Sequence, residues 1–152
     1  PFAMQWPDEI NPMVYDYPIS SMDILPTIAA LTNAPVGVNL PLDGVNILPY
    51  LKGEKKGRPH HTLFVRKFDD DLYSVREGDM KLISKKKNSI QELYDLSNDL
   101  SEETALASKF PDQVKRLDSI RKNWDKQLID PVFLGLMHTE RWQKRAGKKK
   151  KN

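Results

Sequence analysis

Three short segments in which apolar and polar side chains alternate lie close together between residues 72 and 95, and they constrain the fold more than any other feature. Such alternation is typical of β-strands, because successive side chains on a strand point to opposite faces of the sheet. Gly78-Asp79 separates the first two segments, and the polar run 85–89 separates the second from the third. One tight turn and one longer turn between short strands indicate an antiparallel meander.

A further strand is predicted before the meander and a helix after it. Residues 60–66 have the composition of a strand, and residues 110–128 have helical spacing with Pro111 at the first helical position. A small sheet needs a covering layer, so we expect the helix to pack on the meander as a small α+β unit. The predicted buried face of the helix consists of Val114, Leu117, Ile120 or Arg121, Trp124 and Leu128.

The first third of the chain is organised differently. The apolar run 1–7 predicts a strand of a larger sheet, whose neighbouring strands lie outside this chain. Residues 20–32 then have helical spacing, with Asp23 as the predicted N-cap and Pro26 at the third helical position. This helix should end at 33–35, and a short helical turn is expected at 48–51. The apolar side of the first helix is predicted to contain Met22, Leu25, Ile28, Ala29 and Leu31 or Thr32.

Composition excludes several classes of site. The chain has no cysteine, which excludes disulfides, thiolate metal sites and a cysteine nucleophile. No apolar run approaches the roughly 18 residues that a membrane span requires, so we predict no membrane partner. The chain begins with Pro1 rather than methionine, and we interpret it as a fragment or a processed product.

Charge is distributed unevenly. The net charge is +3, but residues 140–152 hold seven Lys/Arg against one Glu, so residues 1–139 carry −3. A short run dominated by one residue type cannot bury a core, and we therefore expect the basic tail to be partly disordered.

Four motifs follow one another along the chain, and they are Ser-x-x-Asp-x-x-Pro-Thr at 20–27, Leu-Asp-Gly at 42–44, Val-Arg-Glu-Gly-Asp-Met-Lys-Leu at 75–82 and Glu-Leu-Tyr-Asp-Leu at 92–96. In this order they resemble the C-terminal part of the formylglycine-dependent (type I) sulfatases, in the alkaline-phosphatase-like superfamily. The resemblance covers residues 1 to about 128. The chain departs from the family pattern at Asp8, Val65, Met80, Leu100 and Ala105, where Gly, Trp, Trp, Pro and Asn are common.

The resemblance implies an α+β fold in which a small antiparallel meander sheet is packed by a C-terminal helix and preceded by a strand–helix piece of a larger α/β sulfatase domain. On this interpretation, residues 1–53 end the α/β domain and residues 54–59 form a linker. Residues 60–130 form the C-terminal subdomain, and residues 131–152 form the basic tail.

Sulfatases hydrolyse sulfate esters with a formylglycine made from Cys or Ser in a C/S-x-P/A-x-R motif, beside a divalent cation that is usually Ca²⁺. A diol oxygen of the formylglycine attacks sulfur while the cation neutralises the sulfate oxygens. No serine of this chain is followed by x-Pro/Ala-x-Arg. The resemblance therefore implies that this segment holds no catalytic residue, metal ligand or cofactor, and that they belong to a missing N-terminal catalytic domain.

The resemblance further implies that the parent sulfatase is periplasmic or secreted. Its substrate would be a sulfated ester, such as a sulfated carbohydrate.

The predicted substrate-binding residues are His60, His61 and Arg66. Imidazole and guanidinium groups are suitable hydrogen-bond donors for a sulfate or a sugar carboxylate, and these residues begin and end one predicted strand. The alternative is that one histidine is exposed and Arg66 pairs with Asp69 or Asp70. A metal site at the histidine pair is disfavoured, because adjacent residues on a strand point to opposite faces.

Two other functions stay open. The cations of residues 141–151 could make the chain a polyanion-binding module, by releasing counterions from a nucleic acid or a sulfated polysaccharide. Specific nucleic-acid recognition is not predicted, because Trp142 is the one aromatic residue interleaved with these cations. The segment could also belong to a related phosphate-ester hydrolase of the same superfamily.

Overall fold

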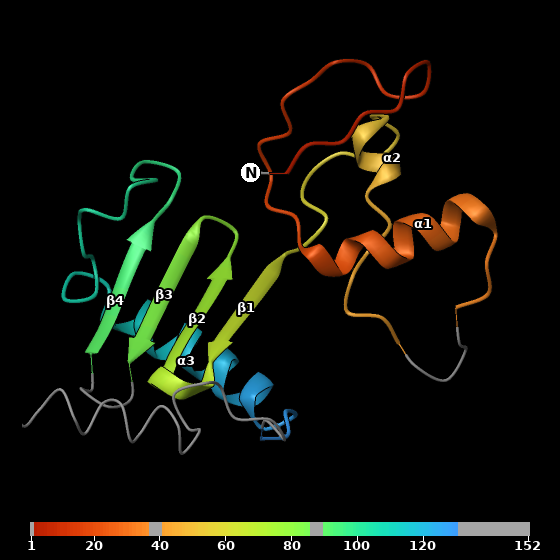
Figure 1. Ribbon diagram of the computed structural model, residues 1–152. Coiled ribbons are helices and arrows are strands. Elements are labelled where there is room, and N and C mark those ends of the chain that lie inside the picture. Colours follow the sequence, from red (N-terminus) through yellow and green to blue (C-terminus); the bar gives the residue numbers. More distant parts are fainter. Residues whose placement is uncertain (1, 37–40, 86–89, 131–152) are drawn as a thin grey trace, which may run out of the picture. The chain divides into compact units, whose positions relative to one another are not determined.

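A computed structural model describes residues 2–36, 41–85 and 90–130 of the chain (Figure 1). Contacts within the chain cluster into two compact units, Pro1–His61 and Thr62–Asn152, which we call the N-terminal unit and the C-terminal unit. No helix in the described ranges is long and apolar enough to cross a membrane.

The C-terminal unit contains a four-stranded antiparallel sheet with the strand order β1-β2-β3-β4 (Figure 1). Its strands are β1 (Thr62–Lys67), β2 (Leu72–Glu77), β3 (Met80–Lys85) and β4 (Ile90–Asp95). Gly78 lies in the tight turn between β2 and β3 with a φ of 60°, a conformation that glycine adopts without a steric penalty. The meander and the strand before it are therefore confirmed in type and order.

A short turn follows β1. It consists of the short 3₁₀ helix η2 (Phe68–Asp70), and Asp71 ends it in the left-handed conformation with a φ of 53°.

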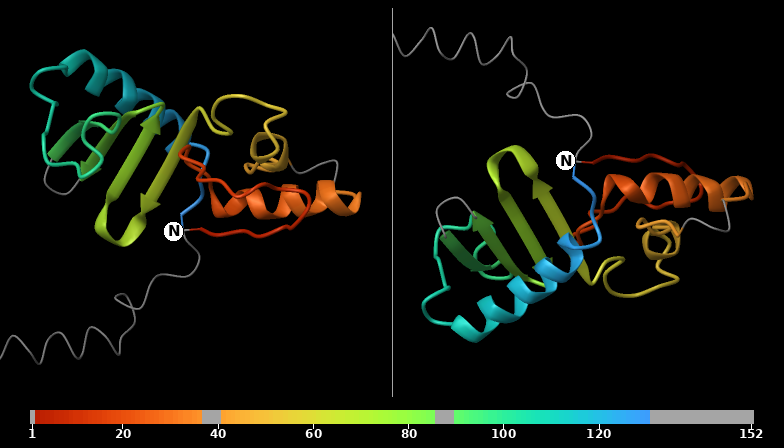
Figure 2. Two further views of the ribbon diagram at one scale, coloured as in Figure 1. Left: turned by 90° about the horizontal axis from the view of Figure 1, so that it is seen from above. Right: turned by 90° about the horizontal axis from the view of Figure 1, so that it is seen from below.

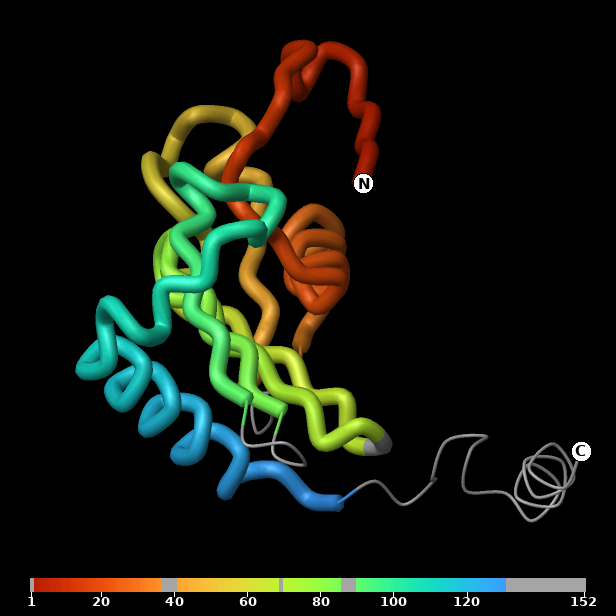
Figure 3. Tube along the Cα trace, turned by 90° about the vertical axis from the view of Figure 1, so that its left-hand side faces the viewer, coloured from red at the N-terminus to blue at the C-terminus, as the bar shows by residue number. Residues whose placement is uncertain are grey.

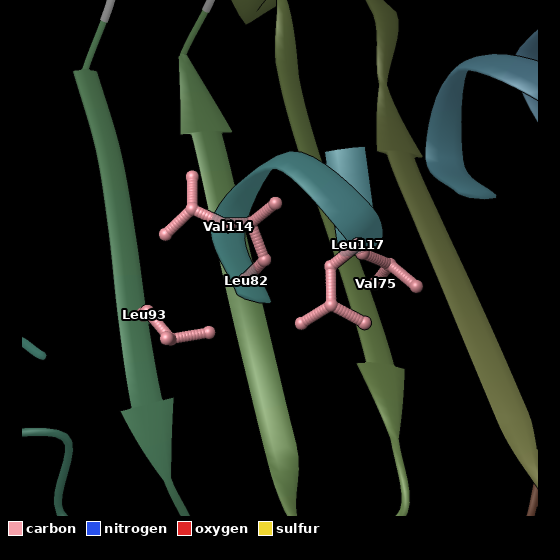
Figure 4. Packing of buried hydrophobic residues seen from close by; sticks show 5 residues of the cluster. All are labelled: Val75, Leu82, Leu93, Val114 and Leu117. Atoms are coloured by element: carbon pink, nitrogen blue, oxygen red, sulfur yellow. The ribbon is translucent and has the colours of Figure 1, made fainter. Parts of the chain in front are cut away.

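The helix α3 (Pro111–Asp125) covers one face of this sheet (Figure 2). Cross-strand register pairs Val75 with Leu82 and Leu82 with Leu93, so these side chains form one row on the covered face. The helix adds its own apolar residues to that row, and the buried core consists of Val75, Leu82, Leu93, Val114 and Leu117 (Figure 4). Each such side chain contributes about 1.5–3 kcal/mol on full burial, which is what holds the helix to the sheet.

The N-terminal unit contains the 3₁₀ turn η1 (Ser21–Asp23), the helix α1 (Ile24–Thr32) and the short helix α2 (Leu48–Leu51). Pro26 occupies the third position of α1 as predicted. The helix ends where expected, because Asn33 adopts the left-handed conformation with a φ of 51°.

The predicted strand at residues 1–7 is not formed in the described part of the chain. Residues 2–6, at the red end of the trace in Figure 3, have no regular secondary structure. A strand needs a hydrogen-bonded neighbour, and the described residues provide none for this segment. Phe2 and Met4 are accordingly exposed.

The predicted apolar side of α1 faces away from its own unit. The buried residues of the helix are Thr27, which is outside the predicted apolar side, and Ala29, which is the one member of that side that is buried. The outward residues are between 43% and 56% exposed, and they are Met22, Ile24, Leu25, Ile28 and Leu31. We call this set the α1 stripe. Contiguous exposed apolar residues of this kind commonly mark a surface that another body covers.

Candidate functional site

The most completely buried polar group of the N-terminal unit is the carboxylate of Asp23, which is 1% exposed. Its Oδ2 accepts a hydrogen bond from the backbone N–H of Ser20 at 2.7 Å, and its Oδ1 accepts one from the N–H of Val45 at 2.9 Å. Asp23 stands at the N-cap position of α1 but makes no side-chain cap to that helix. Its side chain instead forms a capping box with Ser20 around η1, while the predicted position of Asp23 as the N-cap residue is confirmed.

His60 completes the surroundings of this carboxylate. Its Nε2 lies 2.7 Å from Oδ1 and 2.9 Å from Oδ2 of Asp23, and the imidazole is almost entirely buried. An ionised carboxylate is only an acceptor, so Nε2 carries the proton and donates. Contact between His60 and a ligand would therefore have to be made through Nδ1.

The charge on Asp23 follows from these contacts. Burial raises the pKa of the carboxyl group, but the N–H groups of Ser20 and Val45 and the imidazole of His60 lower it by a larger amount. The pKa of Asp23 therefore lies below its ordinary value of 3.8. Asp23 is thus ionised at neutral pH and can hold three donors at once.

Gly44 brings the Leu-Asp-Gly segment against the start of α1. A Cβ atom at this position would lie 2.0 Å from the carbonyl oxygen of Met22, so only a residue without a side chain allows this approach. The same approach places the N–H of Val45 on Asp23, and the N–H of Ile47 donates to Oγ1 of Thr27 at 3.1 Å. Two of the family motifs therefore form one packed structural unit.

The other two predicted site residues have different surroundings. His61 is exposed at the end of the N-terminal unit. Arg66, on β1 of the C-terminal unit, directs Nη2 to Asp130 at 2.9 Å and Nη1 to Asp125 at 3.5 Å, and its guanidinium lies 4.8 Å from the ring centre of Phe68. Their assignment as substrate ligands stays a prediction.

The alternative partner expected for Arg66 was an aspartate of the turn after β1. Asp70 of that turn pairs with Lys67. Arg66 instead pairs with Asp125, at the end of α3, and with Asp130, which follows the helix.

A second charged pair, Asp118 and Arg121, is buried on α3 itself. The sequence predicted either Ile120 or Arg121 on the buried face of this helix. Arg121 is 2% exposed, its Nε donates to Asp118 at 2.8 Å, and its guanidinium lies 4.7 Å from the ring centre of Tyr73. Burial raises the pKa of Asp118, but Lys122 and Arg121 lower it more. The i, i+3 spacing of Asp118 and Arg121 is the signal that could have identified the pair.

The described residues do not fit a metal ion. Among residues 2–36, 41–85 and 90–130, no group of three or more His, Asp or Glu side chains converges as a set of ligands. The Ca²⁺ implied by the family resemblance has no ligand set in this part of the chain.

No family model matches the chain. YdeN, an uncharacterized sulfatase of Escherichia coli K12, is 30% identical over 156 residues, which cover 79% of this chain and 28% of YdeN. Arylsulfatase A of Bos taurus is 39% identical over 79 residues, which cover 50% of this chain and 15% of that protein. A solved Bacteroides thetaiotaomicron structure described as 6S-sulf, from work on the metabolism of multiple glycosaminoglycans, matches with a TM-score of 0.65 at 21% identity and covers 80% of this chain and 28% of that one.

The match to YdeN extends over most of the chain and decides the family. This chain is a sulfatase segment. It spans 28% of the length of YdeN and 15% of that of arylsulfatase A, so most of each relative has no counterpart in it. At 21% identity, the solved structure supports the fold of the segment alone. The family resemblance inferred from the four motifs is confirmed.

Proposed function

We propose that this sulfatase segment completes the fold of a sulfate-ester hydrolase and forms one wall of its substrate cleft. The observation that carries the proposal is the α1 stripe, an apolar surface that the described residues of the N-terminal unit leave exposed. Each of its large side chains would contribute about 1.5–3 kcal/mol on full burial, so a covering body of complementary shape would bind strongly. The catalytic domain of the same sulfatase is the proposed covering body.

The chemistry is proposed to come from that domain. The formylglycine nucleophile and the Ca²⁺ site are assigned to it, because the described residues fit no metal ion and the sequence holds no C/S-x-P/A-x-R motif. The parent sulfatase would be periplasmic or secreted.

This segment is proposed to supply sulfate or sugar contacts from His60, His61 and Arg66. His61 is exposed, whereas His60 donates to Asp23 and Arg66 binds two carboxylates. A sulfated carbohydrate is the proposed substrate class, supported by the glycosaminoglycan context of one structural neighbour.

The related phosphate-ester hydrolases and a polyanion-binding module are the competing functions. The relatives named above are sulfatases, and they favour neither alternative.

Two assays test the proposal together. The full 152-residue chain should release no sulfate from an aryl sulfate with or without added Ca²⁺. Grafted into YdeN in place of the matching segment, the same chain should release sulfate from an aryl sulfate at a rate within about tenfold of that of unaltered YdeN, because the reacting groups stay unchanged. Hydrolysis by the isolated chain, or a folded graft without hydrolysis, would overturn the proposal.

A further inference from the structure

Residues 52–57, between α2 and β1, are all exposed and belong to neither a helix nor a strand. We call them the exposed loop. The loop holds three lysines against one acid. Gly53 and Gly57 have φ values of 74° and 86°, and no described atom lies within 4 Å of the position that a Cβ would take at either residue. The backbone of the exposed loop is therefore accessible at both glycines.

The first lysine of the exposed loop is engaged, whereas the other two lie at its centre. The Nζ of Lys52 pairs with Glu9 and lies 5.3 Å from the ring centre of Trp6. Lys55 and Lys56 follow at the centre of the loop, where both are exposed. The chain is thus held at the start of the loop, and two adjacent cations stand beyond that point.

The residues that follow the centre of the loop are held on the N-terminal unit as well. The hydroxyl group of Tyr15 donates to the carbonyl oxygen of Gly57 at 3.3 Å, and the guanidinium of Arg58 lies 5.4 Å from the ring centre of Tyr17. The two central lysines therefore form the tip of a loop that is fixed on both sides. Exposed loop tips are the places where proteolytic cleavage concentrates.

We propose that the exposed loop is a proteolytic processing site at which this chain is converted into two chains. The protease is a serine endopeptidase whose S1 pocket carries a carboxylate, because such a pocket binds a lysine side chain through a charge-assisted hydrogen bond. Glycine adopts backbone conformations closed to other residues, so Gly53 and Gly57 allow the lysines between them to extend into the cleft of the protease. The proposal does not depend on the proposed function.

The bond assigned to the cut joins Lys56 to Gly57. Lys55 directly follows Glu54, whose carboxylate is repelled by the acidic S1 pocket, and its Nζ lies 5.8 Å from the ring centre of Tyr50. Lys56 is one residue further from that carboxylate and is followed by a residue without a side chain. In the reaction this C–N bond breaks and one water molecule is consumed. Its hydroxyl group goes to the carbonyl carbon of Lys56, and its hydrogen goes to the nitrogen of Gly57.

The two chains are expected to stay together after the cut, because contacts within the N-terminal unit span it. Asp23 precedes the cut and His60 follows it, and Nε2 of His60 lies 2.7 Å from Oδ1 of the buried carboxylate. The contacts of Gly57 and Arg58 with the loop of residues 2–19 also join opposite sides of the cut. The start of the second chain is therefore held on the N-terminal unit by the Asp23–His60 pair.

Limited digestion of the full chain with trypsin tests the site. Mass spectrometry of early time points should detect a fragment that begins at Pro1 and ends at Lys56, before any cut within β1–β4 or α3, because cuts there require local unfolding. Lys55→Ala with Lys56→Ala should slow cleavage of the exposed loop at least about tenfold. The matched control is Lys109→Ala with Lys115→Ala, which removes two exposed lysines of the C-terminal unit and should change that rate by less than about twofold.

Size-exclusion chromatography of the digested protein in increasing urea tests whether the chains stay together. Both fragments of the cleaved wild type should elute in one peak without urea. Cleaved His60→Ala should separate at a lower urea concentration than the wild type, whereas cleaved His61→Ala, altered at the exposed neighbour, should not. Arg58→Ala with Tyr15→Phe is the second variant, which leaves the buried carboxylate paired and should also lower the urea concentration.

Three results would overturn the inference. The first is a cut within a strand or α3 that precedes the cut in the exposed loop. The second is an equal rate of loop cleavage in the double-lysine variant and its control. The third is separation of the cleaved wild type without urea, or equal separation of the His60→Ala, His61→Ala and second-variant proteins.

Discussion

At the scale of single residues, Asp23 is the group on which most of the N-terminal unit depends. Its carboxylate receives donors from Ser20, Val45 and His60, which are far apart in sequence. The local half of this arrangement, the capping box, can be predicted from the Ser-x-x-Asp spacing. The contact with His60 cannot, because 37 residues separate the two side chains and no local pattern relates them.

Replacing Asp23 with asparagine should lower the free energy of unfolding at pH 7 by about 1–3 kcal/mol, because the buried donors lose an ionised acceptor. The pKa of Asp23 is lowered in the folded state, so its stabilisation is fully present above the ordinary value of 3.8 and is lost as the pH falls through the folded-state value. Urea unfolding should therefore show a difference between the variant and the wild type at pH 7 that narrows at pH 3.

The control for this prediction is Asp43→Asn, which removes an exposed carboxylate from the same unit. It should leave stability nearly unchanged at both pH values. An Asp23→Asn variant as stable as the wild type at pH 7 would contradict the role given to this carboxylate.

A second residue-scale prediction concerns Gly44. Gly44→Ala should destabilise the N-terminal unit by about 3 kcal/mol or more, since its Cβ would meet the backbone oxygen of Met22 at 2.0 Å. Gly53→Ala is the matched control, because nothing lies within 4 Å of its Cβ position and only its φ of 74° opposes a side chain, at about 1 kcal/mol. Thermal unfolding of both variants compares the two effects, and equal midpoints would be evidence against the close approach.

At the scale of elements, the sheet of the C-terminal unit could be predicted from the sequence. The strand expected at residues 1–7, in contrast, is not formed among the described residues. Alternation in β2, β3 and β4 is a local signal, and each strand finds its partner one short turn away. Residues 2–6 also have the composition of a strand, but composition does not provide a hydrogen-bonded neighbour. The spacing of apolar residues in α1 identified the apolar side of the helix but did not determine that this side is exposed. Periodicity alone does not say what a helix face contacts.

The packing of α3 on the sheet yields a prediction at this scale. Leu117→Ala should lower stability by about 2–5 kcal/mol, because the side chain is fully buried in the core. Leu100→Ala, at a position that is 79% exposed, should change stability by less than about 0.5 kcal/mol. Urea unfolding followed by far-ultraviolet circular dichroism measures both, and a small effect of Leu117→Ala would contradict the assignment of the core.

At the scale of the whole molecule, the chain spans 28% of the length of YdeN. The sequence motifs were sufficient to identify the family, because four of them occur in order. They do not test His60, His61 and Arg66, because these residues belong to none of the four motifs. The exposed α1 stripe is the observation that supports the proposed covering by a larger domain.

The most direct test of this central claim compares Ile28→Gln in two settings, the isolated chain and the YdeN graft, with Ala29→Gln as the control at a buried position of the same helix. We predict that Ile28→Gln leaves the thermal midpoint of the isolated chain unchanged but lowers that of the graft by at least about 4 °C, because the α1 stripe would be covered in the graft alone. Ala29→Gln should lower both midpoints. An Ile28→Gln graft as stable as its parent would contradict the claim that this surface is made to be covered by the rest of a sulfatase.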